Sequence, residues 1–237
     1  MAKLPWEHTP PYPQLDLNKA QEQGLLTLPH GIQIWHAIFG VPLKETLAAG
    51  TLRVVLLTGG ISHSGHYGYQ VDHLSPKHTV ICFDHRGHGR TPLGDDTWIT
   101  YDKLTTDLLA LLDVYQIPKA ALVSRVDRIF AFGGIDDCDK NEGDAIDELD
   151  SVKEYFNMSQ KEWLKLNPGQ DDNNNFMPYY KLWKREPKWT SETFKDVPVR
   201  GEDNEAPIVW VAAADHDDWM PDHVTARVRG LLRIRAT

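Results

Sequence analysis

Two short motifs in this sequence carry groups that suit the hydrolysis of a carbonyl compound. Gly59 and Gly60 follow the apolar run Arg53 to Leu57, and glycines at a strand end let the backbone turn sharply and point its amides into a cleft. Such amides stabilise the charge that develops on a carbonyl oxygen in acyl transfer. Asp217 follows the apolar run 208–213, where an acid can orient a catalytic imidazole. These residue types point to acyl-transfer chemistry.

The elements that must position these motifs alternate along the chain. Nearly continuous apolar runs at 53–57, 79–83 and 208–213 are typical of parallel strands buried on both faces. Alternating segments on either side of Pro29-His30-Gly31 predict an N-terminal hairpin. A core-facing helix with Thr100 as its N-cap is predicted after the second run. Its apolar residues are Tyr101, Leu104, Leu108, Leu112 and Tyr115. We therefore predict an α/β fold with a mostly parallel sheet.

The composition is that of a globular protein. A chain of 237 residues, 41% hydrophobic and 25% charged, suits a single domain over 1–237. Its formal charge of -9 argues against nucleic acid and other polyanions. No segment approaches a membrane-spanning length and the first residues lack an apolar signal region, so we expect no membrane partner and a cytoplasmic location. Cys82 and Cys138 are interpreted as free thiols.

Residues 134–206 differ from the rest and are expected to form a lid or cap inserted into this domain. Apolar residues from Ile146 to Phe156 indicate one helix, and the capping box Ser159-Gln-Lys-Glu162 predicts the start of another. The aromatic residues that follow could line a pocket or form the core of a small helical subdomain, and both interpretations stay open. They are Phe176, Tyr179, Tyr180, Trp183, Trp189 and Phe194.

Three segments resemble the α/β-hydrolase fold family of the serine-hydrolase type. Leu56 to Gln70 looks like the turn after the third strand of that family, with Thr58 at the position of the usual histidine. Phe83 to Thr91 is similar to the loop Asp-x-Arg-Gly-x-Gly-x-Ser/Thr after the fourth strand, and it is the strongest match. Val211 to Pro221 resembles the loop that carries the triad acid after the seventh strand. The resemblance covers nearly the whole chain.

This resemblance implies a function and a set of site residues. The implied activity is hydrolysis of an ester, lactone or similar bond in a small molecule, with no cofactor. Gly60 and Ile61 would supply the oxyanion amides, and Asp217 would be the triad acid. Arg86 and His88 are expected to have a structural role, in which they satisfy neighbouring carbonyl groups.

Two parts of the family's catalytic apparatus are missing from the expected places. In the family the fifth strand ends in the nucleophile elbow Gly-x-Ser-x-Gly, and a helix then crosses to the sixth strand. Here the link between Ala120 to Val123 and Ile129 to Phe132 is too short for a parallel crossover. Ser124 lies at this junction without flanking glycines, and the single histidine after Asp217 is His223, too near it in sequence for a triad base.

We therefore predict an incomplete or truncated family member with little or no hydrolytic activity, in which Ser124 is at most a poor nucleophile. The alternative is a non-enzymatic protein that binds a small ligand on the same fold. Without the crossover helix, apolar surface on one sheet face is expected to be exposed. A partner that covers this face is a further expectation.

The histidines, 11 in number, raise a metal site as another alternative. Imidazole and carboxylate groups bind zinc and related metals, but no metal-ligand motif such as His-Glu-x-x-His occurs in the sequence. We therefore predict no metal. The candidate ligands considered are His63, His66, His85, His88, His216, Asp217 and His223.

Overall fold

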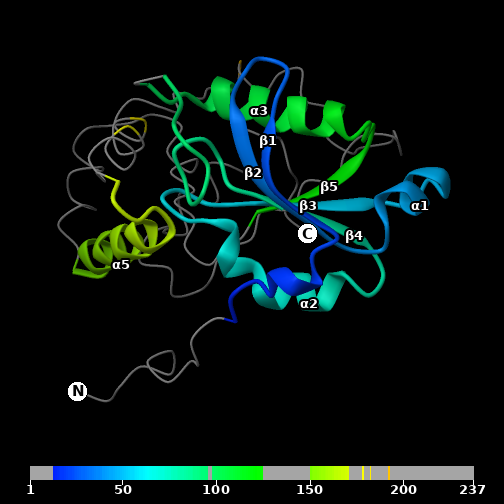
Figure 1. Ribbon diagram of the computed structural model, residues 1–237, viewed down its shortest axis with the longest axis horizontal. Helices are drawn as coiled ribbons and strands as arrows, with labels where there is room; N and C mark the ends of the chain where they lie inside the picture. The colour runs from blue at the N-terminus through cyan, green and yellow to red at the C-terminus, as the bar shows by residue number, and fades with distance from the viewer. Residues whose placement is uncertain are drawn as a thin grey trace.

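The computed structural model describes residues 13–95, 98–124 and 150–170, together with Pro178, Leu182 and Glu192. Five strands in this part of the chain form one sheet in the order β1-β2-β4-β3-β5 (Figure 1). They are β1 Glu22–Thr27, β2 Gln33–Gly40, β3 Arg53–Leu57, β4 Thr79–Phe83 and β5 Ala120–Ser124. The helices are α1 Leu43–Ala48, α2 Gly68–Leu74, α3 Tyr101–Val114 and α5 Asp150–Leu166, with 3-10 turns η2 Leu17–Lys19 and η3 Ser64–Tyr67.

The sheet is mixed, with its parallel part in the middle and at one edge. β3 pairs in parallel with both β4 and β5, whereas β2 is antiparallel to both β1 and β4. The predicted hairpin is thus confirmed, and so is the α/β fold class. The predicted strands 53–57 and 79–83 have the bounds of β3 and β4.

Both faces of the sheet are covered, which explains the continuous apolar runs of β3 and β4 (Figure 1). Val54 and Leu56 of β3 pack on one face with Val71 of α2, while Val55 packs on the other face with Leu111 of α3. Successive side chains of a strand point to opposite faces, so a strand between two helical layers needs apolar residues at every position.

The helix α3 has the predicted position and cap. Thr100 accepts a hydrogen bond from the backbone N–H of Lys103 at 3.1 Å, as an N-cap residue should. The free Cys82 is buried, as expected. Within the described residues no helix combines the length and apolar character that crossing a membrane requires.

The two helices expected around residues 146–166 are wrong, because a single helix α5 runs through Ser159. The buried residues Tyr155, Ser159 and Trp163 recur every four positions along α5, and this spacing forms one continuous face on a helix. The packing of this face carries the helix past the capping-box signal. The predicted strands 129–132 and 208–213, and most of the predicted lid, lie outside the described residues.

β5 is more exposed than the central strands. Leu122 is 52% exposed and Val123 is 37% exposed, whereas all five residues of β4 are buried. Among the described strands β5 pairs only with β3.

Candidate functional site

The candidate site lies at the carboxyl ends of the three parallel strands β3, β4 and β5. β3 leads into the turn that contains Gly60 and Ile61, and β4 leads into the loop 84–91. The backbone of Ser124, the last residue of β5, is paired with Leu57, the last residue of β3. The carboxyl edge of an open α/β sheet is where such folds bind ligands.

The turn after β3 is strained at an unexpected residue. The left-handed conformation falls on Ile61, with φ of 48°, and not on Gly59 or Gly60. A β-branched residue is rarely found in this region of φ, and strained residues of this kind persist only where the surrounding structure fixes them. Ile61 is fixed by packing against a small apolar cluster, which consists of Leu93, Ile99, Leu104, Tyr155 and Leu182.

Three hydrogen-bond donors of this turn have no acceptor among the described residues. Among the described residues, nothing accepts a hydrogen bond from the amide of Gly60 or of Ile61. The hydroxyl of Thr58 is buried and also lacks a partner within the described part of the chain. Unpaired donors in a folded protein call for an explanation, and a bound ligand oxygen is one.

The loop after β4 fixes the turn after β3 through Asp84. This residue is buried, and its carboxylate accepts the backbone N–H of Ser64 at 2.6 Å and that of Arg90 at 2.9 Å. Thr91 donates its hydroxyl to the Asp84 carbonyl oxygen at 2.6 Å. Charge-assisted hydrogen bonds of this kind are strong. The Asp and the Thr of the family-like loop therefore act as positioning residues for the neighbouring turn.

Arg86 has a structural role, as predicted, and one of its partners is a carboxylate. Its guanidinium binds the carboxylate of Asp107 with two hydrogen bonds, at 2.7 Å from Nε and 2.6 Å from Nη2. His30 contacts the same carboxylate at 2.8 Å. His88 does contact a carbonyl oxygen, that of Arg86, at 2.9 Å. A buried arginine requires a charged partner. Asp107 of α3 is such a partner, and the sequence analysis did not predict it.

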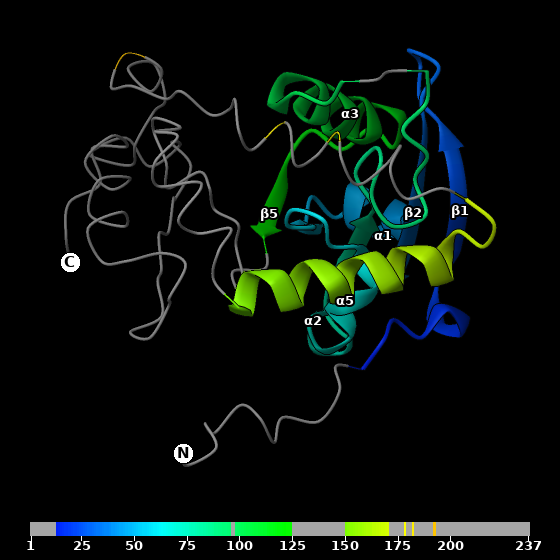
Figure 2. The same cartoon turned by 90° about the vertical axis from the view of Figure 1, so that its left-hand side faces the viewer.

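Helix α5 lies across this edge of the sheet and is tied to it at three points (Figure 2). Tyr155 donates its hydroxyl to the Gly60 carbonyl oxygen at 3.1 Å. Asn167 donates its side-chain amide to the Gly89 carbonyl oxygen at 2.7 Å. The third point is Glu162, which contacts the turn after β3. The capping-box interpretation of this glutamate is therefore wrong.

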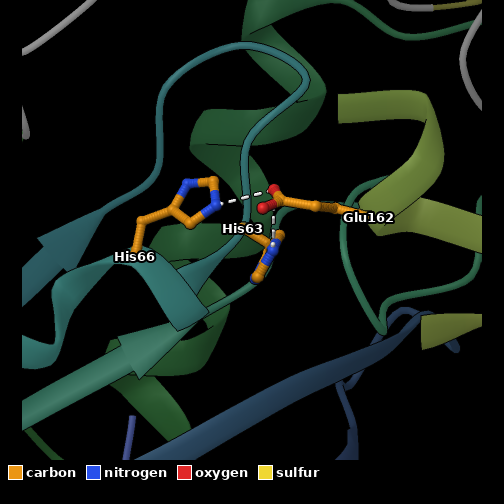
Figure 3. Close-up of side chains that lie close together, drawn as sticks. All are labelled: His63, His66 and Glu162. Atoms are coloured by element: carbon orange, nitrogen blue, oxygen red, sulfur yellow. Dashed lines mark hydrogen bonds and ion pairs between the residues drawn. The ribbon is translucent and has the colours of Figure 1, made fainter. Parts of the chain in front are cut away.

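Glu162 meets two histidines of the turn (Figure 3). Its Oε2 lies 2.8 Å from His66 Nε2 and 3.5 Å from His63 Nε2. Partial burial acts to raise the pKa of Glu162, but hydrogen bonds from His63 and His66 and their charges prevail, so the pKa lies well below its usual range. The carboxylate is thus charged; it accepts a hydrogen bond from His66 Nε2 and lies within ion-pair distance of His63 Nε2.

These three side chains form the one metal-like group among the described residues, with ligand atoms within 4.8 Å of one another. The hydrogen bonds fit a cation poorly. His63 Nδ1 accepts the backbone N–H of Gly65 at 3.0 Å, so the neutral ring carries its proton on Nε2. A metal ligand must present an unprotonated nitrogen. His85 and His88 do not join the group, and burial lowers their pKa values to about 3 and about 4.

Several predicted site residues cannot be placed. Asp217, His216 and His223 lie outside the described residues, as does Cys138. Only the backbone of Ser124 is described.

A family model and a curated relative each match part of this chain. A family model described as serine aminopeptidase, S33 (Hydrolase_4), matches residues 51–133. The chain is similar to 3-oxoadipate enol-lactonase 2 of Acinetobacter baylyi, with 47% identity over 53 residues. This segment is 22% of the chain and 19% of the relative, so the chain matches about a fifth of that protein's length.

Solved structures with similar folds include hydrolases of low identity. A hydrolase from Pseudomonas aeruginosa PA01 has 13% identity and a TM-score of 0.45, over 70% of this chain and 74% of that one. The enol-lactonase from Burkholderia xenovorans LB400 has 16% identity and a TM-score of 0.44, over 68% and 73%. The family model matches the segment that contains β3, β4 and β5 with the turn and loop at their carboxyl ends, so this part of the chain is similar to α/β hydrolases.

Proposed function

We propose that the chain binds a small ester- or lactone-type molecule at the turn after β3 and hydrolyses it poorly, or not at all, through the triad positions of its family. The observation that carries this proposal is the set of unused donors on Thr58, Gly60 and Ile61 within the described part of the chain. Unused hydroxyl and amide donors can bind a carbonyl oxygen, and they bind the oxyanion formed from it more strongly.

The surroundings of the turn support a small ligand that is partly apolar. Ile61 itself is partly exposed and packs against the buried cluster that includes Tyr155 and Leu182, so these donors lie in an apolar part of the molecule. Binding sites for small molecules combine apolar surface with a few convergent polar groups. The match to an enol-lactonase favours a lactone as the first compound to test. The predicted lid over 134–206 and the cytoplasmic location are part of this proposal.

Poor turnover by the family route follows from the end of β5. Ser124 occupies the carboxyl end of the strand next to β3, but its neighbours are Val123 and Arg125 and no Gly-x-Ser-x-Gly motif occurs in the sequence. The strained turn that exposes a family nucleophile depends on those glycines.

Calorimetric titration with an enol-lactone, run beside a hydrolysis assay on the same sample, tests the proposal. We expect measurable binding, no hydrolysis that depends on Ser124, and a loss of about 1 kcal/mol in binding free energy for Thr58→Val, the cost of one hydrogen bond. The control Thr106→Val changes an exposed residue on the outer side of α3. Binding with no turnover at all would favour the ligand-binding alternative. Fast hydrolysis abolished by Ser124→Ala, or no binding of esters and lactones, would contradict the proposal.

A further inference from the structure

One imidazole of the site joins a hydroxyl to a carboxylate. Ser62 Oγ lies 2.9 Å from His66 Nδ1, and His66 Nε2 lies 2.8 Å from Glu162 Oε2. We propose that Ser62, His66 and Glu162 form a second acyl-transfer site, with Ser62 as nucleophile, His66 as base and Glu162 as the residue that positions the base. It requires neither Ser124 nor Asp217.

The hydrogen bonds define the proton positions that such a site needs. The charged Glu162 carboxylate can only accept, so His66 Nε2 carries the ring proton. His66 Nδ1 is then an acceptor, and Ser62 is the donor of the 2.9 Å contact. A nucleophile in contact with a base that a third group orients is the recurring arrangement of covalent catalysis, whatever the order of residues in the chain.

Ser62 is accessible enough to react. It is partly exposed, whereas Ser64, two residues later, is fully buried. His66 and Glu162 are partly buried, with 11% and 26% of their side chains exposed. This shielding strengthens the contacts between them, because charges interact more strongly where water is excluded.

The backbone around Ser62 has two further features of a reactive turn. The residue before it, Ile61, is the strained residue at φ of 48°, and strain of this kind concentrates at functional sites. The unused amides of Gly60 and Ile61 directly precede Ser62 among the described residues. The sequence Gly60-Ile-Ser-His-Ser64 also shares its first four positions with Gly-x-Ser-x-Gly. The final glycine is replaced by Ser64, and Gly65 follows.

Neighbouring contacts hold the three groups in place. Asp84 fixes the backbone of Ser64, while Tyr155 and Asn167 fasten α5 on either side of Glu162. His63 lies beside His66, with ring centroids 4.3 Å apart, and limits its rotation. Precise positioning of this type is what allows a nucleophile and its base to act together.

The reaction follows from these positions. Ser62 Oγ attacks the carbonyl carbon of an ester while its proton passes to His66 Nδ1, and an O–C bond forms. The bond from the carbonyl carbon to the alcohol oxygen then breaks, and the leaving alkoxide takes the proton from Nδ1. Water then attacks the acyl carbon while His66 Nδ1 takes its proton, and a new O–C bond forms. The bond from the acyl carbon to Ser62 Oγ breaks, Oγ regains the proton from Nδ1, and the acid leaves. A fluorophosphonate reacts by the same first step, with formation of an O–P bond and loss of fluoride.

Labelling of the full chain with a fluorophosphonate, followed by digestion and mass spectrometry, tests this site without the need for a known substrate. We expect one adduct, on Ser62. Ser62→Ala should abolish it, while the matched control Ser64→Ala should leave the labelling rate unchanged. His66→Gln should lower the rate by about 100-fold or more, the usual contribution of a general base. No adduct on Ser62, an adduct on Ser124 instead, or an unchanged rate for His66→Gln would overturn the proposal.

The role of Glu162 is tested by separating reaction from binding. Glu162→Gln should lower the limiting rate of labelling by about 10-fold or more, because an orienting acid sets the tautomer of the base. The reagent concentration that gives half of the limiting rate should stay unchanged in Glu162→Gln. The control Glu154→Gln, at an exposed position of the same helix, should change neither the limiting rate nor that concentration. Labelling should also be unaffected by chelation. A rate lost with EDTA and restored by zinc, or a limiting rate unchanged in Glu162→Gln, would overturn the assigned roles.

Discussion

The carboxyl ends of β3 and β5 are neighbours in the sheet but differ in the contacts that the described residues make around them. The turn after β3 is held by Asp84 from the loop after β4 and by Tyr155 and Glu162 from α5. β5 ends at the family's nucleophile position, yet its residues Leu122 and Val123 are exposed. A reactive site requires side chains that other elements hold in place, and within the described residues the end of β3 has such support.

The difference has a simple physical origin. Buried polar groups must be paired, so the polar loop after β4 has to use its hydrogen bonds on neighbouring segments. Asp84, Arg86 and Thr91 do this, and they order the edge of the sheet near β3. An exposed apolar residue such as Leu122 makes no such demand on its neighbours.

The largest predicted effect concerns the buried ion pair between Arg86, in the loop after β4, and Asp107 of α3. Asp107→Asn should lower the free energy of unfolding by about 3 to 5 kcal/mol, because the buried Arg86 guanidinium would lose its counter-charge. Urea denaturation measures this loss. The control Asp113→Asn, at an exposed position of the same helix, should stay within about 0.5 kcal/mol. A small effect of Asp107→Asn would show that the loop after β4 does not depend on this pair.

A smaller loss is expected where α5 meets the turn. Tyr155→Phe removes the hydroxyl that binds the Gly60 carbonyl oxygen, and the buried acceptor left behind should cost about 1 to 3 kcal/mol of stability. Thermal unfolding detects the change. Tyr69→Phe is the matched control, because Tyr69 is 54% exposed and its variant should melt like the parent. Equal melting of both variants would mean that α5 does not hold the turn.

Glu162 should also stabilise the contact between α5 and the turn after β3, and its contribution to the free energy of unfolding should depend on pH. Its pKa is lower in the folded protein than the ordinary value of 4.5, because the bonds and charges of His63 and His66 outweigh burial. A lowered carboxyl pKa adds stability above the unfolded pKa, and this stability is lost as the pH falls below it. Glu162→Gln should therefore cost about 1 kcal/mol at pH 7 and progressively less below about pH 4.5.

The free energies of unfolding of the parent protein and of Glu162→Gln, measured at a series of pH values, should approach each other as the pH falls. The control Glu154→Gln, at an exposed position, should show no such trend. A difference that stayed constant down to pH 3 would indicate that the charge of Glu162 contributes nothing.

The smallest effect on stability is expected at β5. Leu122→Thr replaces a side chain that is 52% exposed, so the free energy of unfolding should change by no more than about 0.5 kcal/mol. Binding of a hydrophobic dye should nevertheless fall, because the expected apolar surface lies on this side of the sheet. Leu25→Thr, with an equally exposed leucine on β1, is the control. If the dye bound the parent protein no better than Leu122→Thr, the expectation of an exposed apolar face at β5 that a partner covers would be contradicted.

The sequence alone determined the framework of this protein. β3, β4 and α3 were predictable because their signals are local: continuous apolar runs for buried strands, helical spacing for α3, and Thr100 as a cap. The loop motif 84–91 identified the family-like edge of the sheet. Asp107 also has a local signal that the interpretation overlooked. It lies three residues after Leu104 and four before Leu111, on the buried face of α3, where an acid requires a charged partner.

Only the tertiary structure decided which polar residues meet. Glu162 has the sequence signature of a helix cap, but α5 continues through that position and carries the carboxylate to His66, 96 residues away in the chain. The strain at Ile61 likewise depends on packing between distant segments. Local preferences act over a few residues, whereas a site is assembled from hydrogen bonds and contacts between segments that only the folded chain brings together.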